Sequence, residues 1–185
     1  MPEVVLGIDP GLTRCGFGIV SSERGRNVSF LEVGVLTSDA SAEIEDRIHH
    51  IGRQVADLLD RVQPNRVAIE RVFSQLNLKT VVSVANISGV IVYLCAERGI
   101  RVDFYTPTQV KAAVTGSGKA NKSQVTNMVV KLLKLKEVPK PADAADALAI
   151  AITGAWRAGE FTGKELTTAQ RIWLQAEAAS KKRQR

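Results

Sequence analysis

Four acidic residues stand in local contexts that suit one metal-binding site. Asp9 closes the apolar run Val-Leu-Gly-Ile-Asp, and Glu70 closes the run Val-Ala-Ile-Glu. Asp143 and Asp146 lie three residues apart in an alanine-rich segment, which puts them on one face of a helix. Mg²⁺ prefers oxygen ligands and offsets the repulsion between carboxylates. The four acids therefore predict a divalent-cation site suited to phosphate chemistry.

The two acids at the strand ends each have a simpler interpretation. Asp9 alone is equally consistent with a turn-capping aspartate, and its Gly-x-Asp-x-Gly pattern also occurs in actin-like ATPases. Glu70 alone is consistent with a salt bridge to Arg66 or Arg71. Neither residue identifies a metal site without the others.

The two helical acids also have an alternative. Carboxylates near the start of a helix cap its free amides and complement its dipole, which suits Asp143 well and Asp146 less well. Like charges at this spacing disfavour a helix unless another group neutralises them. Considered together, the four acids favour the metal site over the separate interpretations.

Charge and composition narrow the class of protein. The chain has 185 residues, of which 45% are hydrophobic, enough for one domain with a sizeable core. Its net charge is +6, so a basic surface around an acidic pocket is expected to suit a polyanion such as DNA. The alternative, that mild basicity only aids solubility, is equally compatible with the charge.

The compartment is predicted from absent signals and from cysteine usage. No apolar stretch reaches the length of a membrane span, and the N-terminus lacks a secretory signal, so we expect no membrane association. Cys15 and Cys95 have no ligand-like spacing and stand in apolar contexts. We interpret them as reduced core residues of a cytoplasmic protein.

Hydrophobic periodicity predicts an α/β fold. Apolar alternation indicates strands at residues 3–9, 16–20 and 28–36, arranged as an antiparallel meander. Ser41, followed by Glu43 and Glu45, is expected to open a helix at 41–62. The remaining elements are expected to be strands at 66–70 and 101–105 and helices at 77–98, 107–114, 121–134 and 142–156. This order predicts a five-stranded mixed sheet with helices on both faces.

A basic segment follows the fifth strand. The run Gly-Ser-Gly-Lys at 116–119 resembles part of a phosphate loop, but the required glycine and hydroxyl residues are missing, so a nucleotide site is excluded. Lys111, Lys119 and Lys122 nevertheless suit contacts with phosphodiesters, the alternative being ordinary surface lysines. His49 and His50 lie far from every acid in the sequence and are interpreted as surface or satisfied core residues.

The segment after Glu70 suggests contacts with bases and with a second subunit. Phe73 follows that acid by three residues, where it is expected either in the core or stacked on bases. Lys79, six residues further on, is a candidate DNA contact. The helix at 77–98 is apolar on more than one face and carries small residues, so it must bury a second face inside the domain or against another subunit; we favour a homodimer contact.

Five segments occur in order with compatible spacing: Gly-Ile-Asp-Pro-Gly at 7–11, Ala-Ile-Glu-x-Val-Phe at 68–73, Gln-Val-Lys at 109–111, Lys-Ser-Gln-Val at 122–125 and Ala-Asp-Ala-Ala-Asp-Ala-Leu-Ala-Ile-Ala at 142–151. Together they resemble the RuvC family of bacterial Holliday-junction resolvases over about residues 3–155. The resemblance implies an RNase H-like fold and a homodimer with two active sites. It also implies paired, Mg²⁺-dependent nicking of four-way DNA junctions in recombination and repair.

The resemblance also implies roles for individual residues. The metal ligands would be Asp9, Glu70, Asp143 and Asp146, holding two Mg²⁺ ions per site, with Mn²⁺ as a possible substitute. Two-metal hydrolysis would leave 5′-phosphate and 3′-hydroxyl ends.

The same resemblance assigns the DNA contacts. Phe73 would wedge into the junction centre, whereas Lys111 and Lys122 would hold DNA or support catalysis. Lys79 and Lys119 are added as expected DNA contacts. A RuvA–RuvB branch-migration complex is the implied partner.

The domain prediction is a nuclease domain at 1–156 and a basic C-terminal tail at 157–185, expected to be flexible or a loosely attached helix. Three rival functions stay open. An actin-like ATPase would share the turn after Asp9, and a non-catalytic junction-binding module would share the basic surface. A nuclease for flaps or RNA–DNA hybrids would share the acids, since fold alone does not fix function.

Overall fold

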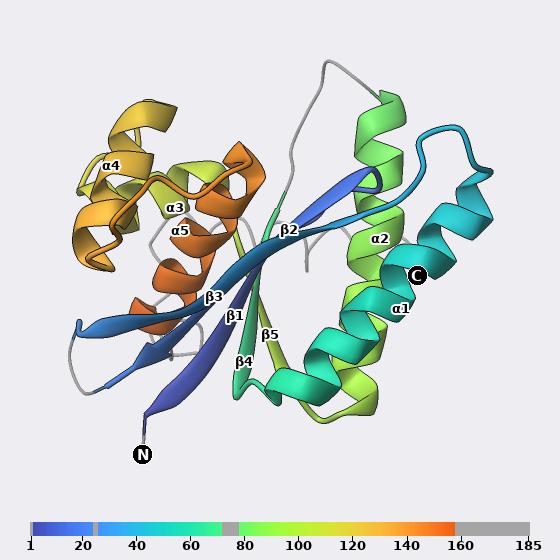
Figure 1. Cartoon of the computed structure of the whole chain (residues 1–185), viewed down its shortest axis with the longest axis horizontal. Coiled ribbons are helices and arrows are strands. Elements are labelled where there is room, and N and C mark those ends of the chain that lie inside the picture. Colours follow the sequence, from blue (N-terminus) through green and yellow to red (C-terminus); the bar gives the residue numbers. More distant parts are fainter. Residues whose placement is uncertain (1, 24–25, 72–77, 158–185) are drawn as a thin grey trace, which may run out of the picture.

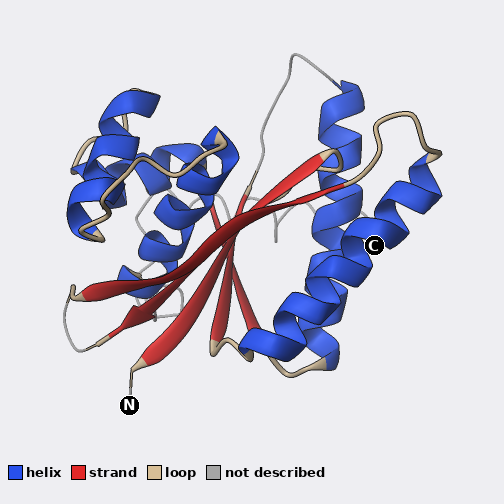
Figure 2. Ribbon diagram, in the orientation of Figure 1, coloured by secondary structure: helices blue, strands red, loops and turns tan. Residues whose placement is uncertain are grey.

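A twisted five-stranded sheet runs through the middle of the molecule, with helices on both faces (Figures 1 and 2). The computed structural model describes residues 2–23, 26–71 and 78–157. Along the chain the elements are β1 (Glu3–Asp9), β2 (Arg14–Ser22), β3 (Val28–Thr37), α1 (Ile44–Val62), β4 (Arg66–Glu70), α2 (Leu78–Glu97), β5 (Arg101–Tyr105), α3 (Pro107–Thr115), α4 (Lys122–Leu132) and α5 (Ala142–Trp156). The predicted α/β class, the mixed sheet and the order of elements are confirmed.

Strand pairing brings two of the predicted metal ligands to one edge of the sheet. The order is β3-β2-β1-β4-β5, with β1, β2 and β3 antiparallel and β4 parallel to both β1 and β5. Parallel neighbours end at the same edge of a sheet, and Ile8 of β1 lies opposite Ile69 of β4. The next residue of each strand, Asp9 and Glu70, therefore stands at the same level.

Side-chain alternation decides which face these acids occupy. Leu6, Ile8 and Ile69 pack into the core beneath α1 and α2. Because successive strand residues point to opposite faces, Asp9 and Glu70 point to the other face, which is covered by α3, α4 and α5 (Figure 1). The period-two pattern that buries the core thus directs both carboxylates toward α5.

Close backbone contact brings α5 onto the sheet. A methyl group built on Gly7 of β1 would lie 2.3 Å from the Ala147 carbonyl oxygen and 2.3 Å from the Ala151 nitrogen. One built on Gly16 of β2 would lie 2.4 Å from the Asp143 carbonyl oxygen. Glycine on the strands and alanine on the helix therefore let α5 lie against β1 and β2 with almost no side chain between them.

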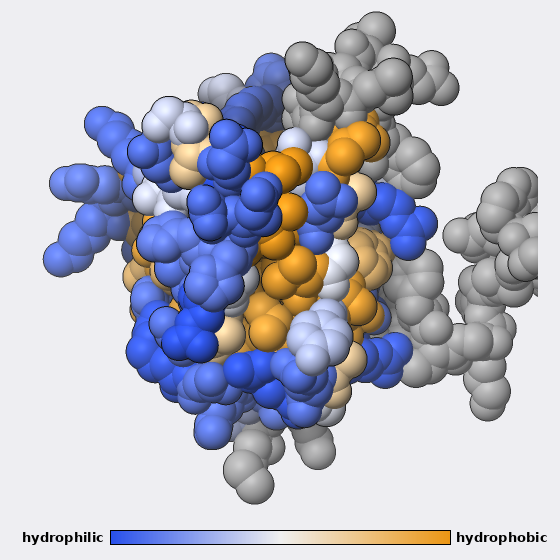
Figure 3. All heavy atoms as spheres, turned by 90° about the vertical axis from the view of Figure 1, so that its right-hand side faces the viewer, coloured by the Kyte–Doolittle hydropathy of each residue, from blue (hydrophilic) through white to orange (hydrophobic). Residues whose placement is uncertain are grey.

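Helix α2 is hydrophobic on its outer side as well as on its inner side. Ile87, Ile91 and Cys95 of α2 are buried against the sheet layer, whereas Val82 and Tyr93 are 53% and 61% exposed. A band of hydrophobic residues is visible on this face of the molecule (Figure 3). The expected second apolar face of this helix is therefore present in the structure.

The largest error in a predicted helix boundary is at the start of α1. α1 begins at Ile44, after Glu43 as N-cap, and not at residue 41. The backbone amide and hydroxyl of Ser41 both donate to Asp39 Oδ1, at 2.9 and 2.7 Å, so this serine belongs to a preceding turn. A local side-chain hydrogen bond of this kind competes with helix formation.

The two cysteines are buried and form no disulfide. Burial is the main cause that raises the pKa of Cys15 to about 12 and that of Cys95 to about 11, so both are thiols at neutral pH.

His49 and His50 are exposed on α1, as expected for surface residues. Among the described residues, no helix is both long enough and apolar enough to span a bilayer. The predicted tail lies outside the described residues except for Arg157.

The contact between Gly7 and α5 gives a stability prediction. Gly7→Ala should destabilise the protein by at least about 2 kcal/mol, because the new methyl group meets backbone atoms that cannot rotate away. Gly52→Ala in α1 is the control, since its methyl group would meet only Val90 Cγ1 at 3.1 Å, a side chain that can turn. The control should stay within about 1 kcal/mol of the wild type in chemical denaturation. Equal effects of the two substitutions would contradict the proposed contact.

Candidate metal centre

Three of the four predicted ligands form a compact acidic cluster. One carboxylate oxygen from each of Asp9, Asp143 and Asp146 lies within 4.8 Å of the others. Asp9 comes from the end of β1, and the other two come from the first two turns of α5. All three side chains are partly buried. Glu70 is not in this cluster, although it ends the neighbouring strand β4 and faces the same way.

The electrostatics of the site reflect this crowding. Burial, followed by the charges of Asp146 and Asp143, raises the pKa of Asp9 to about 6, with Lys122 acting in the opposite direction. Burial, followed by Asp9 and Asp146, raises the pKa of Glu70 to about 7. The charges of the cluster therefore act on Glu70, although its carboxylate oxygens are not among those that lie within 4.8 Å of one another. Both shifts reflect the free-energy cost of holding several negative charges together away from water.

The alternative interpretation of Glu70, a salt bridge to Arg66 or Arg71, is not supported. Arg66 Nε lies 3.2 Å from Glu3, and the same guanidinium pairs with Asp103. Arg71 instead lies over the ring of Phe104, 5.4 Å from its centroid. Among the residues that the structure describes, Glu70 has no ion-pair partner.

The capping interpretation of Asp143 also fails in part. The N-cap of α5 is Pro141, and no side chain forms a cap hydrogen bond there. Asp143 lies in the first turn, where the helix dipole favours its charge. The dipole thus helps to retain this acid, but it does not account for Asp146 or for the approach of Asp9.

Lysines reach the cluster from the neighbouring helices. Lys122, the first residue of α4, donates from Nζ to Asp146 Oδ2 at 2.7 Å. Its position is fixed by a capping box, in which Asn121 and Gln124 exchange side-chain and backbone hydrogen bonds. Asp146 raises the pKa of Lys122, first through this hydrogen bond. The charge of Lys111, on α3, lowers the pKa of Glu70.

Arg14 is a site residue that was not predicted from the sequence. Its Nε lies 2.9 Å from Asp143 Oδ2, at the start of β2. The strand register pairs Asp9 with Gly16, which places Arg14 just beyond the acid cluster. The available signal was that Arg14 is a basic residue two positions before Gly16, the strand partner of Asp9. Using this signal requires knowledge of the register between β1 and β2.

The residues present fit a divalent metal ion. Asp143 Oδ2 is buried and accepts no hydrogen bond, because Arg14 approaches it without hydrogen-bond alignment. A buried carboxylate oxygen without a hydrogen bond is unusual and suggests a further partner. All donors in the cluster are carboxylate oxygens, which suit a hard cation such as Mg²⁺. Asp9, Asp143 and Asp146 could therefore hold a metal ion, with Glu70 as the nearest additional acid.

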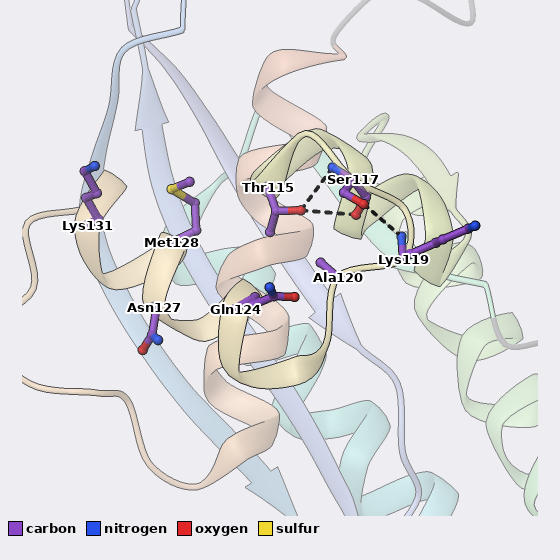
Figure 4. A pocket seen from close by; sticks show the side chains of 8 residues that line it. All are labelled: Thr115, Ser117, Lys119, Ala120, Gln124, Asn127, Met128 and Lys131. Atoms are coloured by element: carbon purple, nitrogen blue, oxygen red, sulfur yellow. Dashed lines mark hydrogen bonds between the residues drawn. The ribbon is translucent and has the colours of Figure 1, made fainter.

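The remaining predicted DNA contacts are dispersed. Lys119 is exposed and lines a hollow of about 570 Å³ between α3 and α4, with Lys131 at the opposite end (Figure 4). Lys79 lies in the first turn of α2, and its side chain is outside the described part of the structure. Phe73 also lies outside the described residues.

Known proteins of one family match this chain. The family model described as crossover junction endodeoxyribonuclease RuvC matches residues 5–154. Proteins of that name from Paenarthrobacter aurescens and Pseudarthrobacter chlorophenolicus are each 50% identical to the chain. The first match covers 97% of both chains, and the second covers 96% of this chain and 97% of its relative.

Solved structures agree with these matches. Thermus thermophilus RuvC in complex with a Holliday junction substrate is similar with a TM-score of 0.81 at 36% identity, covering 89% of this chain and 99% of that one. The yeast mitochondrial Holliday junction resolvase Ydc2, at 16% identity and a TM-score of 0.60, shares the fold. The predicted RNase H-like fold is confirmed.

The raised pKa values predict how stability depends on pH in the absence of metal. Asp9 and Glu70 bind protons more tightly in the folded state than in the unfolded chain. Stability should therefore be highest below about pH 4 as far as these groups are concerned, and should fall as pH rises through about 6 to 7. Asp9→Asn should be more stable than the wild type near pH 8 by roughly 1–3 kcal/mol, with no difference near pH 4.

Thermal unfolding in chelator and in Mg²⁺ would measure this effect. Mg²⁺ should stabilise the wild type more than Asp9→Asn, because it compensates the charge that the variant lacks. A wild-type advantage over Asp9→Asn near pH 8 in chelator would contradict the electrostatic account.

Proposed function

Because the chain belongs to the RuvC family of crossover junction endodeoxyribonucleases, we propose that it resolves four-way DNA junctions by paired symmetric nicks. The protein is a nuclease of this family. The observation that carries the proposed mechanism is the cluster of Asp9, Asp143 and Asp146 within 4.8 Å. Metal-assisted hydrolysis needs such a cluster, whereas a module that only binds DNA does not.

In the proposed active site, Asp9, Glu70, Asp143 and Asp146 hold two Mg²⁺ ions, with Mn²⁺ as an acceptable substitute. When bound, the ions lower the pKa of the attacking water and stabilise the leaving 3′ oxygen. The carboxylates orient the ions, so no side chain has to act as a nucleophile. The products are a 5′-phosphate and a 3′-hydroxyl, which a ligase can join.

The lysines around the cluster serve the substrate phosphate in this proposal. Lys122 Nζ, 2.7 Å from Asp146, is close enough to the acids to contact the scissile phosphate and stabilise the negative charge that develops on it. Lys111, whose charge lowers the pKa of Glu70, holds the strand. Lys119 contacts a DNA arm from the exposed connection between α3 and α4, and Lys79 contacts DNA from the start of α2.

Phe73 is proposed to open the junction. It follows Glu70 by three residues, which keeps an aromatic side chain within a short stretch of chain from the acids. An aromatic ring inserted at the junction centre would stack on an unpaired base and hold the strands apart.

Paired nicking requires two active sites, and we propose that α2 forms the homodimer contact. Exposed residues of this helix that are small, apolar or aromatic recur on one face: Val82, Ala85, Gly89, Tyr93 and Ala96. The hydrophobic band in Figure 3 supports an interface on this side of the molecule. Two-fold symmetry then presents equivalent strands of the junction to the two sites.

The wider setting is proposed from the same function. A junction resolvase acts on chromosomal DNA, so we assign the protein to the cytoplasm and to recombination and repair. A RuvA–RuvB branch-migration complex is the proposed partner. Residues 1–156 are proposed as the nuclease domain, and the basic tail predicted at 157–185 lies outside the described residues except for Arg157.

A substrate panel tests the function. The purified protein is incubated with a four-way junction, a flap, a plain duplex and an RNA–DNA hybrid, with Mg²⁺ and with chelator. Symmetric nicks confined to the junction and dependent on metal are expected.

In the same assay, Asp146→Asn should cut at least about 100-fold more slowly than the wild type while still binding the junction, because it loses a ligand but also repels phosphate less. Preferential cutting of the flap or the hybrid would assign the acids to another substrate.

The dimer is tested with two matched valines. Val82 on α2 is 53% exposed and Val138, between α4 and α5, is 48% exposed. Val82→Glu should weaken dimerisation at least about tenfold by placing a charge in the apolar contact, whereas Val138→Glu should not change it. Sedimentation equilibrium at micromolar concentration measures both variants. A monomeric wild type, or equal behaviour of the variants, would exclude α2 as the interface.

A further inference from the structure

Two arginines lie next to the acidic cluster, at Asp143 and not at Asp146, where Lys122 binds. Arg14 and Arg47 line a hollow of about 370 Å³ that also contains Thr13 and Asp143 in its wall. Because Asp143 belongs to both the hollow and the cluster, a chain bound in the hollow would lie directly beside the metal centre. Neither arginine has a role in the function proposed above.

Among the described residues Arg47 forms no contact ion pair, and the only carboxylate whose pKa its charge lowers is that of the exposed Asp39. Its Nη2 donates to Thr13 Oγ1 at 2.6 Å, and its Nε donates to Ser38 Oγ at 3.3 Å. Both acceptors are neutral hydroxyls, and no carboxylate of the described residues forms a contact ion pair with this guanidinium. A guanidinium fixed in place by hydroxyl groups retains its charge and further N–H groups for an anion, and a phosphate fits its geometry well.

Arg14 has a carboxylate neighbour, but its contact with that neighbour is incomplete. Its side chain is 60% exposed, and its Nε lies 2.9 Å from Asp143 Oδ2. The oxygen accepts no hydrogen bond, so Arg14 offsets the charge of Asp143 without satisfying it. A divalent cation that takes this oxygen as a ligand would compete with the guanidinium for the same position.

We propose that Arg14 is an exchangeable counter-ion of Asp143. When a divalent cation binds Asp143, the Arg14 guanidinium leaves the carboxylate and, together with Arg47, binds a backbone phosphate of the DNA strand in the hollow. The inference rests on the proposed function, because it takes DNA as the ligand. It assigns to the hollow a phosphate site next to the cleavage site, and to Arg14 a positioning role.

Exchange makes metal binding and DNA binding cooperative. The metal releases Arg14 for the phosphate, and the phosphate in turn removes Arg14 from Asp143, so each ligand increases the affinity for the other by the same factor. If Arg14 only held Asp143 in position for the metal, its removal would weaken metal binding. The two roles therefore predict opposite effects on metal affinity in the absence of DNA.

The test compares Arg14→Ala with Arg61→Ala. Arg61 of α1 is a suitable control because its side chain is 56% exposed and, like Arg14, it pairs with a carboxylate. Its Nη1 lies 2.7 Å from Oε2 of Glu32 on β3. Calorimetry measures Mg²⁺ affinity without DNA, and fluorescence anisotropy measures junction affinity in chelator and in Ca²⁺, which also prefers oxygen ligands. Arg14→Ala should bind Mg²⁺ about fivefold more tightly, and its junction affinity in Ca²⁺ should fall about fivefold or more. Arg61→Ala should match the wild type in both measurements.

Arg47→Gln tests the phosphate site in the hollow separately from the exchange of Arg14 at Asp143. Glutamine can still donate to Thr13, but it lacks the charge, so junction affinity should fall in chelator and in Ca²⁺ alike while Mg²⁺ affinity is unchanged. Weaker Mg²⁺ binding by Arg14→Ala would overturn the exchange, and so would a gain in junction affinity from Ca²⁺ equal to that of the wild type. If the wild type binds no junction, the proposed function itself fails. If the wild type binds and Arg14→Ala behaves as Arg61→Ala does, the inference alone fails.

Discussion

Electrostatic repulsion among carboxylates is the constraint on which the rest of the structure depends. Three acids share a space of 4.8 Å in a partly buried position, a fourth stands at the next strand end, and two of the four have strongly raised pKa values. The protein tolerates this arrangement because each acid belongs to an element fixed by other forces. β1 and β4 are held by the sheet and its hydrophobic core, and α5 is held by its buried alanine, leucine and isoleucine side chains. Arg14 and Lys122 provide partial compensation at 2.9 and 2.7 Å.

Much of the fold could be predicted from the sequence because each element carries its own hydrophobic period and its own end signals. β1 shows it well: alternation places Leu6 and Ile8 in one core layer, and so the acid that follows Ile8 had to face the opposite layer. Helix α3 begins at Pro107, as predicted, and α4 begins at Lys122, one residue after the predicted start; capping boxes at Thr106 and Asn121 fix these two positions. The start of α1 was missed because Ser41 has a competing partner, Asp39, two residues earlier. The sequence around Ser41 is compatible both with the start of a helix and with a turn closed by Asp39, and the sequence pattern alone does not choose between them.

The site was predictable to the level of residue type but not to the level of distance. Position at a strand end identifies Asp9 and Glu70 as candidates, yet only the three-dimensional arrangement shows that Asp9 approaches α5 more closely. Arg14 and Arg47 are separated by 33 residues and meet through the pairing of β2 with the rest of the sheet and the path of α1 across it. No periodicity encodes such a contact. The ligand roles of the four acids and the DNA roles of Phe73, Lys79 and Lys119 remain predictions, of which the experiments above address the roles of Asp9 and Asp146.

The glycine–alanine contact between α5 and the strands has a mechanical consequence. Where side chains separate two elements, rotamer changes let the spacing vary by fractions of an ångström as neighbours mutate or as the protein fluctuates. Between Gly7 or Gly16 and α5 there is almost no side chain to rearrange, so the spacing is set by contact between backbones. The distance from Asp9 to the two helical acids is thereby insulated from substitutions elsewhere in the core. Surface residues that contact neither DNA nor a second subunit can diversify while the separation of the carboxylates stays constant.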